Sequence, residues 1–205
     1  MSYSIVWESE DLKNLNDKIT EAGGALQGCC MYQNGTRNFA VRKNIEDLRQ
    51  NLFDCGKRSK KILEVGFNAG HSNLLFLLGN PNAEILNFDL MGHKYSYPCF
   101  EYLKSKYNVS VIAGNSMKTL LQKERDIFDL IHIDGGHGDK PAFHDLVNCK
   151  RFADKNTLMI FDDTNSQTIT KILEFAINCN FIKEINYEKE NLKEIKHHRI
   201  FRYRT

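Results

Sequence analysis

Apolar and polar positions alternate in blocks along the central part of the chain. Short apolar runs that end in glycine or acidic residues are typical of buried strands. Such runs fall at residues 60–66, 83–90, 109–116, 128–136 and 156–165. Segments with helical spacing of apolar residues lie between them, at 69–80, 102–107, 117–125, 141–153 and 166–179. This alternation predicts a mostly parallel sheet with helices on both faces.

The two ends of the chain follow other patterns. Residues 181–190 and 197–205 are strand-like runs joined by a short polar stretch, which predicts an antiparallel pair at the end of the sheet. The first 58 residues predict irregular helices, among them one at 44–55. We therefore expect a single domain over 1–205, with an N-terminal helical or lid segment (1–58) and an α/β core (59–205).

Composition limits the class of protein. The chain has 205 residues, of which 41% are hydrophobic and 26% charged, as in globular domains. No apolar run approaches the roughly 18 residues of a membrane span, and the N-terminus turns polar too early for a signal peptide. These features predict a cytoplasmic protein, in which the six cysteines stay reduced. A net charge of +2 argues against nucleic-acid binding through bulk charge.

Ligands of open α/β sheets bind beyond the carboxyl ends of the strands. The first strand ends in a turn where Gly66 and Gly70 permit tight backbone geometry, and Asn68 suits a left-handed conformation. The turn lacks the G-x-G-x-x-G pattern, which argues against a pyrophosphate cradle and a nicotinamide dehydrogenase. An ordinary turn between a strand and a helix is the alternative.

Two further strand ends suggest a nucleoside site. Asp89 ends the second strand about 20 residues after the glycine turn, where a carboxylate can accept from both hydroxyls of a ribose. Ser116 follows the third strand and suits an adenine edge, or alternatively a helix N-cap.

The fourth and fifth strands end in carboxylates. Asp134 ends the fourth strand, and Asp162 and Asp163 end the fifth. If these strands are neighbours, their ends lie about 5 Å apart, and a divalent cation is the simplest compensation for such crowded charge. The alternative is that these residues cap helices. His137 lies beside them and could accept a proton as a general base, whereas His132 alternates inside a strand and is a weaker candidate.

Together the motifs resemble class I S-adenosylmethionine (SAM)-dependent methyltransferases. They are KILEVGFNAGHS (61–72), LNFDL (86–90), IAGNS (112–116), LIHIDGGH (130–137) and LMIFDD (158–163). The resemblance covers roughly residues 60–165 and is strongest to small metal-dependent O-methyltransferases of the catechol and macrocin O-methyltransferase type. It implies a Rossmann-like seven-stranded methyltransferase sheet, mostly parallel with an antiparallel last strand, and helices on both faces.

The resemblance also implies site roles. The residues implied to bind SAM are Glu64, Gly66, Asn68, Gly70, His71, Ser72, Asp89, Leu90, Ser116 and Asp134. Those implied to bind a divalent cation, Mg²⁺ in these relatives, are Asp134, Asp162 and Asp163. His137 and Asp134 are the expected catalytic residues. Catechol O-methyltransferase has Lys where this chain has His137 and Asn where it has Asp163, which argues against a catechol substrate.

The expected reaction is methyl transfer to a hydroxyl of a small molecule or sugar. Three alternatives remain: a metal-independent methyltransferase, an RNA methyltransferase using the basic C-terminal tail, and a SAM-binding module without catalysis. No membrane partner is expected, and the sequence leaves the oligomeric state open, a homo-oligomer included.

Overall fold

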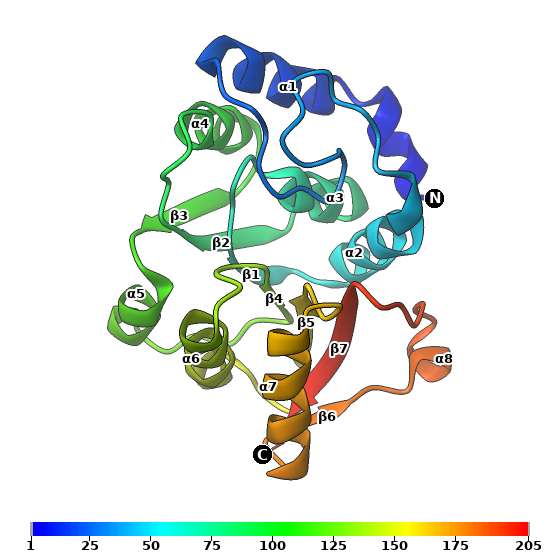
Figure 1. The fold of residues 1–205 in the computed structure, drawn as a ribbon, viewed down its shortest axis with the longest axis vertical. Helices are drawn as coiled ribbons and strands as arrows, with labels where there is room; N and C mark the ends of the chain where they lie inside the picture. The colour runs from blue at the N-terminus through cyan, green and yellow to red at the C-terminus, as the bar shows by residue number, and fades with distance from the viewer. Residues whose placement is uncertain (1, 205) are drawn as a thin grey trace.

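A seven-stranded sheet forms the centre of the protein in a computed structural model that describes residues 2–204 (Figure 1). The strands are β1 (Lys61–Val65), β2 (Glu84–Asp89), β3 (Val109–Ala113), β4 (Leu130–Ile133), β5 (Leu158–Asp162), β6 (Ile182–Glu184) and β7 (His198–Tyr203). Their order is β3-β2-β1-β4-β5-β7-β6. Strand β7 runs antiparallel to both neighbours, and all other pairs are parallel. The sheet predicted from the sequence is therefore confirmed.

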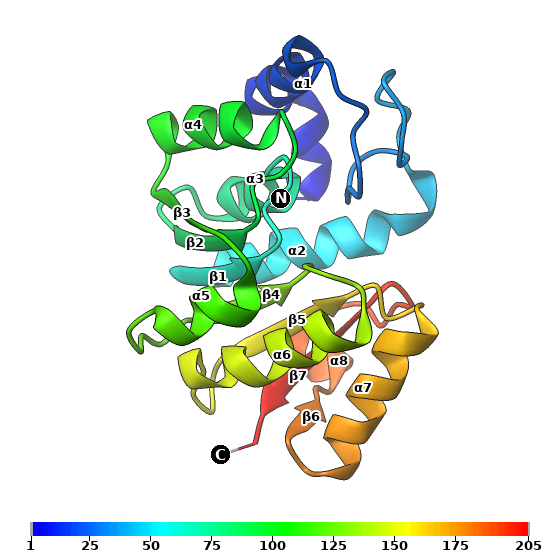
Figure 2. The same cartoon turned by 60° about the vertical axis from the view of Figure 1, so that its left-hand side comes forward.

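Helices cover both faces of the sheet (Figure 2). They are α1 (Glu10–Ala22), α2 (Glu46–Arg58), α3 (His71–Gly79), α4 (Ser96–Lys106), α5 (Ser116–Gln122), α6 (Asp139–Cys149), α7 (Gln167–Asn178) and the short α8 (Tyr187–Glu190). Short 3₁₀ helices are η1 (Tyr3–Glu8), η2 (Lys43–Ile45) and η3 (Lys150–Phe152). Helices α1 to α4 bury their apolar residues in one core, and α5 to α7 bury theirs in a second core on the opposite face.

Helix α3 is apolar around nearly its whole circumference because it is covered on all sides. It packs between the sheet and α2, and the two helices approach so closely that a Cβ on Gly56 would lie 2.5 Å from the Cα of Phe76. Only glycine fits such a crossing. This contact attaches the N-terminal segment firmly to the α/β core.

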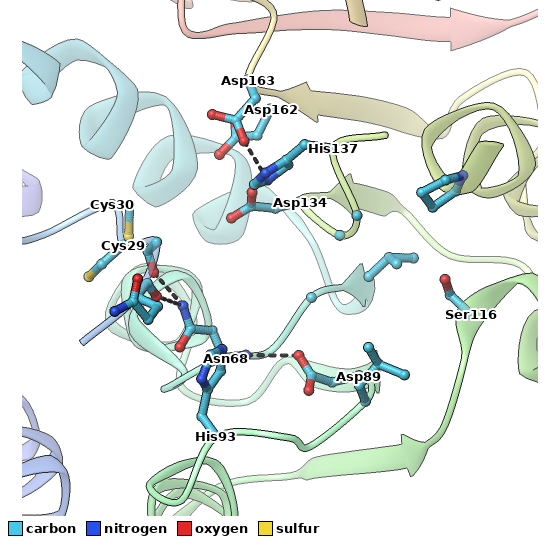
Figure 3. A pocket seen from close by; sticks show the side chains of 18 of the residues that line it. Cys29, Cys30, Asn68, Asp89, His93, Ser116, Asp134, His137, Asp162 and Asp163 are labelled. Atoms are coloured by element: carbon cyan, nitrogen blue, oxygen red, sulfur yellow. Dashed lines mark hydrogen bonds and ion pairs between the residues drawn. The ribbon is translucent and has the colours of Figure 1, made fainter. Parts of the chain in front are cut away.

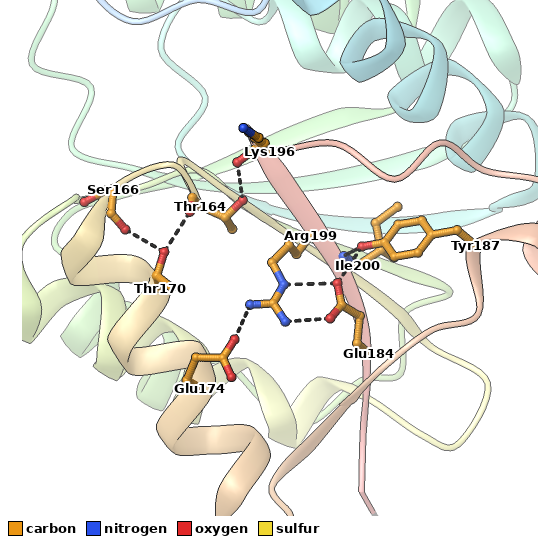
Figure 4. A network of polar contacts seen from close by, with 9 residues as sticks. All are labelled: Thr164, Ser166, Thr170, Glu174, Glu184, Tyr187, Lys196, Arg199 and Ile200. Carbon is orange, nitrogen blue, oxygen red and sulfur yellow. Dashed lines mark hydrogen bonds and ion pairs between the residues drawn. The ribbon is translucent and has the colours of Figure 1, made fainter.

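The C-terminal strands differ from a simple hairpin. Strand β7 inserts between β5 and β6, and α8 lies in the connection. Figure 4 shows how this region is held: Arg199 on β7 bonds Glu184 of β6 and, at 2.6 Å, Glu174 of α7. Thr164, just after β5, donates to the carbonyl of Lys196 at 2.9 Å. These contacts fix the loop that follows the carboxyl end of β5.

No helix among residues 2–204 is long and apolar enough to cross a membrane.

Candidate functional site

A cavity of about 1070 Å³ opens at the carboxyl edge of β1, β2, β4 and β5. One wall is this edge of the sheet, and the opposite wall comes from the N-terminal segment around Gln27–Asn34 (Figure 3). The sequence placed its candidates at strand ends, and the parallel sheet brings those ends together.

Gly66 allows the ends of β1 and β4 to meet. Its φ of +102° is in a region that L side chains rarely adopt, and a Cβ there would lie 2.0 Å from the carbonyl oxygen of Asp134. Any side chain would push the end of β4 away. Gly66 therefore sets the position of Asp134 at the cavity rim.

Asp89 lies at the β2 end of the cavity. Its carboxylate accepts from the backbone N–H of Asn68 at 3.0 Å and from the backbone N–H of Met91. A carboxylate so fixed keeps lone pairs for further donors, and the ribose role of Asp89 stays a prediction. Leu90, 73% exposed, and Ser116 also line the cavity. The N-cap of α5 is Asn115, not Ser116, since Asn115 accepts from the backbone N–H of Met117 at 3.0 Å.

Asn68 has the left-handed backbone expected from the sequence, with φ of +53°. Its side chain does not point freely into the cavity, because its amide donates to the carbonyls of Gln27 and Gly28. The residue thus ties the N-terminal segment to the first strand–helix turn and shapes the wall of the cavity.

Four of the residues implied to bind SAM lie behind the cavity wall rather than on it: Glu64, Gly70, His71 and Ser72. Glu64 is fully buried, and its oxygens are taken by His132 and Asn73. Gly70 is the left-handed N-cap of α3. The structure therefore places these four where they support the turn, and direct contact with a cofactor stays a prediction for them.

The carboxylates of β4 and β5 meet at the rim of the cavity, as the sequence predicted (Figure 3). Their side chains, however, contact different partners. His137 Nε2 lies 2.6 Å from an oxygen of Asp163, whose φ is +56°. Asp163 raises the pKa of His137 against the opposing effect of burial. Asp162 instead turns inward. Asp134 lies between the two groups, and burial together with the Asp162 charge raises its pKa well above the ordinary value.

Two buried histidines, His132 on β4 and His198 on β7, compensate Asp162. His132 Nε2 lies 3.5 Å from one oxygen of Asp162, and His198 Nδ1 lies 3.2 Å from the other. Burial opposes these charges, yet the contacts raise the pKa of His132 and lower that of Asp162. A histidine within an apolar strand needs a polar partner, and this signal could have identified His132.

Cys29 and Cys30 also line the cavity (Figure 3). Cys29 Sγ lies 3.2 Å from His71 Nδ1 and accepts from the backbone N–H of Met31 at 3.2 Å. Burial raises the pKa of the Cys29 thiol, but its neighbours Cys30 and His71 outweigh this and lower it. Two adjacent cysteines carry no spacing pattern, so only the fold reveals their place.

The N-terminal segment and the loop after β2 both form part of the cavity wall. Tyr32 and Gln33 of the N-terminal segment line the cavity, as do Gly92 and His93. His93 stacks on Tyr95 with ring centroids 5.0 Å apart, which holds it at the cavity edge. Met31, by contrast, is fully buried in the core.

The sheet order, the antiparallel β7 and a cavity at the carboxyl edge define the class I methyltransferase fold. Residues 63–164, about half of the chain, match the family model described as a methyltransferase domain. The chain therefore belongs among the SAM-dependent methyltransferases of class I fold.

Solved structures share this fold at low sequence identity. The SAH-bound methyltransferase PaMTH1 of Podospora anserina superimposes with a TM-score of 0.68 at 15% identity, over 96% of this chain and 89% of that one. A putative O-methyltransferase of Klebsiella pneumoniae superimposes with a TM-score of 0.65 at 17% identity, over 96% of this chain and 91% of that one. An O-methyltransferase of Bacillus cereus in complex with SAH superimposes with a TM-score of 0.64 at 15% identity, over 92% of this chain and 89% of that one. Comparison with curated proteins gives no match.

Proposed function

We propose that this protein transfers the methyl group of SAM to a hydroxyl of a small molecule or sugar, with a divalent cation at the rim of the cavity. The proposal is based on the His137–Asp163 pair, which lines the same end of the cavity as Asp134 and Asp162. A base and an acidic metal-binding rim on the same wall suit the activation of a hydroxyl.

The cavity and its donors fit the groups that this reaction needs. About 1070 Å³ is at the upper end of small-molecule sites and accommodates a cofactor together with an acceptor. Asp134 and Asp162 offer the hard oxygen ligands that divalent cations prefer. The Oδ1 atom of Asp162 is buried and lies 3.2 Å from Nδ1 of His198, which leaves Oδ2 as the oxygen to bind a cation. Asp163 is engaged by His137, so its expected role as a third ligand remains a prediction.

Different residues of this chain have different roles in the proposed reaction. Asp89 and the strand–helix turn hold the nucleoside end of SAM, which supplies the methyl group. A cation held by Asp134 and Asp162 would lower the pKa of the acceptor hydroxyl. His137 Nδ1 accepts the hydroxyl proton, while Asp163 binds Nε2, orients the imidazole and stabilises its charged form. The segment around Cys29–Gln33 covers the acceptor side and excludes water.

The test is methyl transfer from labelled SAM to a panel of sugars and small hydroxylated metabolites. We expect transfer to fall on chelation and to return with Mg²⁺ or Mn²⁺. His137→Ala should lower kcat by about 10²-fold, since a general base contributes 10² to 10⁴. His144→Ala, on α6 and outside the cavity wall, is the matched control.

Two results would count against this proposal. Full transfer by an Asp134→Ala/Asp162→Ala double variant in chelator would leave a metal-independent methyltransferase. SAM binding by calorimetry with no transfer to any acceptor of the panel would favour a binding module.

A further inference from the structure

The buried imidazole of His132 has no role in the reaction proposed above, although it lies beside the acidic residues of the cavity rim. It lies on β4 and is fully buried, two residues before Asp134 on the same face of the strand. Its Nδ1 lies 2.6 Å from Oε1 of Glu64, its neighbour across the sheet on β1. A carboxylate at Nδ1 fixes the ring and keeps a proton on Nδ1, so a metal ion at Nε2 would displace the Nε2 proton and bind the lone pair on that side.

Nε2 of His132 has no hydrogen-bond partner among residues 2–204. The nearest acidic atom, Oδ2 of Asp162, is 3.5 Å away, beyond the 2.7–3.2 Å of a good N–H···O bond. Two ligands of one metal ion, each about 2.1 Å from it, are separated by roughly 3.0 Å in octahedral and 3.4 Å in tetrahedral geometry. The separation of His132 and Asp162 is therefore that of neighbouring ligands.

Asp134 completes a set of three donors. A ligand atom from each of His132, Asp134 and Asp162 lies within 4.8 Å of the other two. Asp134 and Asp162 line the cavity, so an ion can enter from it. Asp163, by contrast, lies 2.6 Å from His137, a hydrogen-bond distance that is too short for two ligands on one ion.

Outer groups hold the set in place. Glu64 supports His132 and also accepts from Asn73. His198 Nδ1 lies 3.2 Å from the second oxygen of Asp162, and its Nε2 contacts the amide of Asn51 at 2.9 Å. Such outer partners of a histidine and a carboxylate are typical of protein metal sites.

We propose that His132, Asp134 and Asp162 form a mixed nitrogen–oxygen site for a divalent transition-metal ion such as Mn²⁺ or Fe²⁺, selected over Mg²⁺ by the imidazole. Carboxylates alone suit Mg²⁺, whereas imidazole adds affinity for transition metals. The proposal rests on the proposed function for the catalytic use of the ion, but binding is testable by itself. Asp163 is left free to orient His137.

The test is Mn²⁺ binding to the purified, chelator-treated protein, followed by electron paramagnetic resonance. We expect one bound Mn²⁺ per chain, displaced by Mg²⁺ only at a 100-fold or greater excess. Pulsed spectra should show nitrogen coupling from one imidazole, and histidine labelled with ¹⁵N should change that coupling. This measurement needs no variant, so it tests whether His132 binds the ion even if substitutions of His132 prevent folding.

Matched variants separate this site from its surroundings. His132→Gln should weaken Mn²⁺ binding at least tenfold, change Mg²⁺ binding less than threefold and abolish the nitrogen coupling. His198→Gln alters the other histidine that touches Asp162 and should change Mn²⁺ binding less than threefold. Thermal unfolding checks that both variants fold.

Bound Mn²⁺ without nitrogen coupling, or equal Mn²⁺ affinity in folded His132→Gln, would overturn the proposal. So would the absence of Mn²⁺ binding. Normal Mn²⁺ binding without methyl transfer to any acceptor would instead refute the proposed function and leave this site standing.

Discussion

Asp145 on α6 is a buried carboxylate whose charge is only weakly compensated, by nearby Ser116 and His144. The residue is fully buried, and neither of its carboxylate oxygens has a hydrogen-bond partner among the described residues. Burial raises its pKa to about 6. The folded state therefore binds a proton more tightly than the unfolded chain, and stability falls as pH rises from about 4 to about 6.

Asp145→Asn removes this charge and keeps the shape of the side chain. We expect it to stabilise the fold at pH 7.5 by roughly 2–3 kcal/mol, since each pKa unit corresponds to about 1.4 kcal/mol. The gain should be much smaller at pH 4, where the folded wild type is protonated and the unfolded wild type is about half protonated. Urea unfolding at the two pH values measures it. An equal effect of the substitution at pH 4 and pH 7.5 would contradict the assignment.

At the level of single residues, the sequence revealed the strand-end groups but not their partners. Asp134, Asp162, Asp163 and His137 could be placed at one rim because each ends or follows a strand. That Asp162 turns toward His132 and His198 depends on side-chain packing between β4, β5 and β7. Distances of this kind have no periodic signal in the sequence.

Arg49 links two elements that form the far wall of the cavity. It lies on α2, almost fully buried, and its guanidinium donates to the carbonyls of Cys30 and Arg42 at 2.9 Å. It also stacks against the rings of Tyr3 and Trp7 at 5.5 and 5.4 Å. One side chain therefore holds the segment that carries Cys29 and Cys30 against the helices.

Arg49→Met keeps the apolar stem and removes the donors. It should cost about 2–4 kcal/mol, because two carbonyls lose their partner in a buried site. We also expect faster limited proteolysis within residues 27–42 and weaker acceptor binding. Arg37→Met, exposed on the same segment, is the control. Unchanged unfolding by urea and unchanged proteolysis would show that the segment is held by other contacts.

The order of the elements was predictable, but their ends were less so. Helix α4 begins at Ser96, ahead of the 102–107 expected from apolar spacing. Its first turn is held by tertiary contacts: Ser96 donates to the carbonyl of Asn68 at 2.6 Å, and Tyr95 accepts from the backbone of Gln27 at 3.1 Å. Local periodicity does not carry contacts between segments this far apart in the chain.

Considered as a whole, the molecule places its cavity between the N-terminal segment and the sheet. Residues from Gln27 to His197 line it, so a bound ligand bridges elements that are distant in sequence. A ligand that binds only the folded state stabilises it by RT ln(1 + [L]/Kd). Cofactor binding should therefore be visible in global unfolding.

S-adenosylhomocysteine at 100 times its Kd should stabilise the protein by about 2.7 kcal/mol. For a chain of about 200 residues this corresponds to a rise in Tm of roughly 5–10 °C. Differential scanning fluorimetry measures the shift. NAD serves as the control and should leave Tm unchanged, since the turn at Gly66 lacks the dinucleotide pattern. A shift with NAD and none with S-adenosylhomocysteine would refute the cofactor assignment.

The sequence by itself determined the alternation of strands and helices, the parallel sheet and the acidic residues at its edge. Hydrophobic periodicity and strand-end chemistry are local properties, and the chain displays them directly. Only the tertiary structure decided that β7 lies beside β5, that His198 and His132 flank Asp162, and that Cys29 and Cys30 face the cavity. These arrangements depend on packing between residues far apart in the chain, such as Asn51 and His198 at 147 positions, which local patterns do not encode.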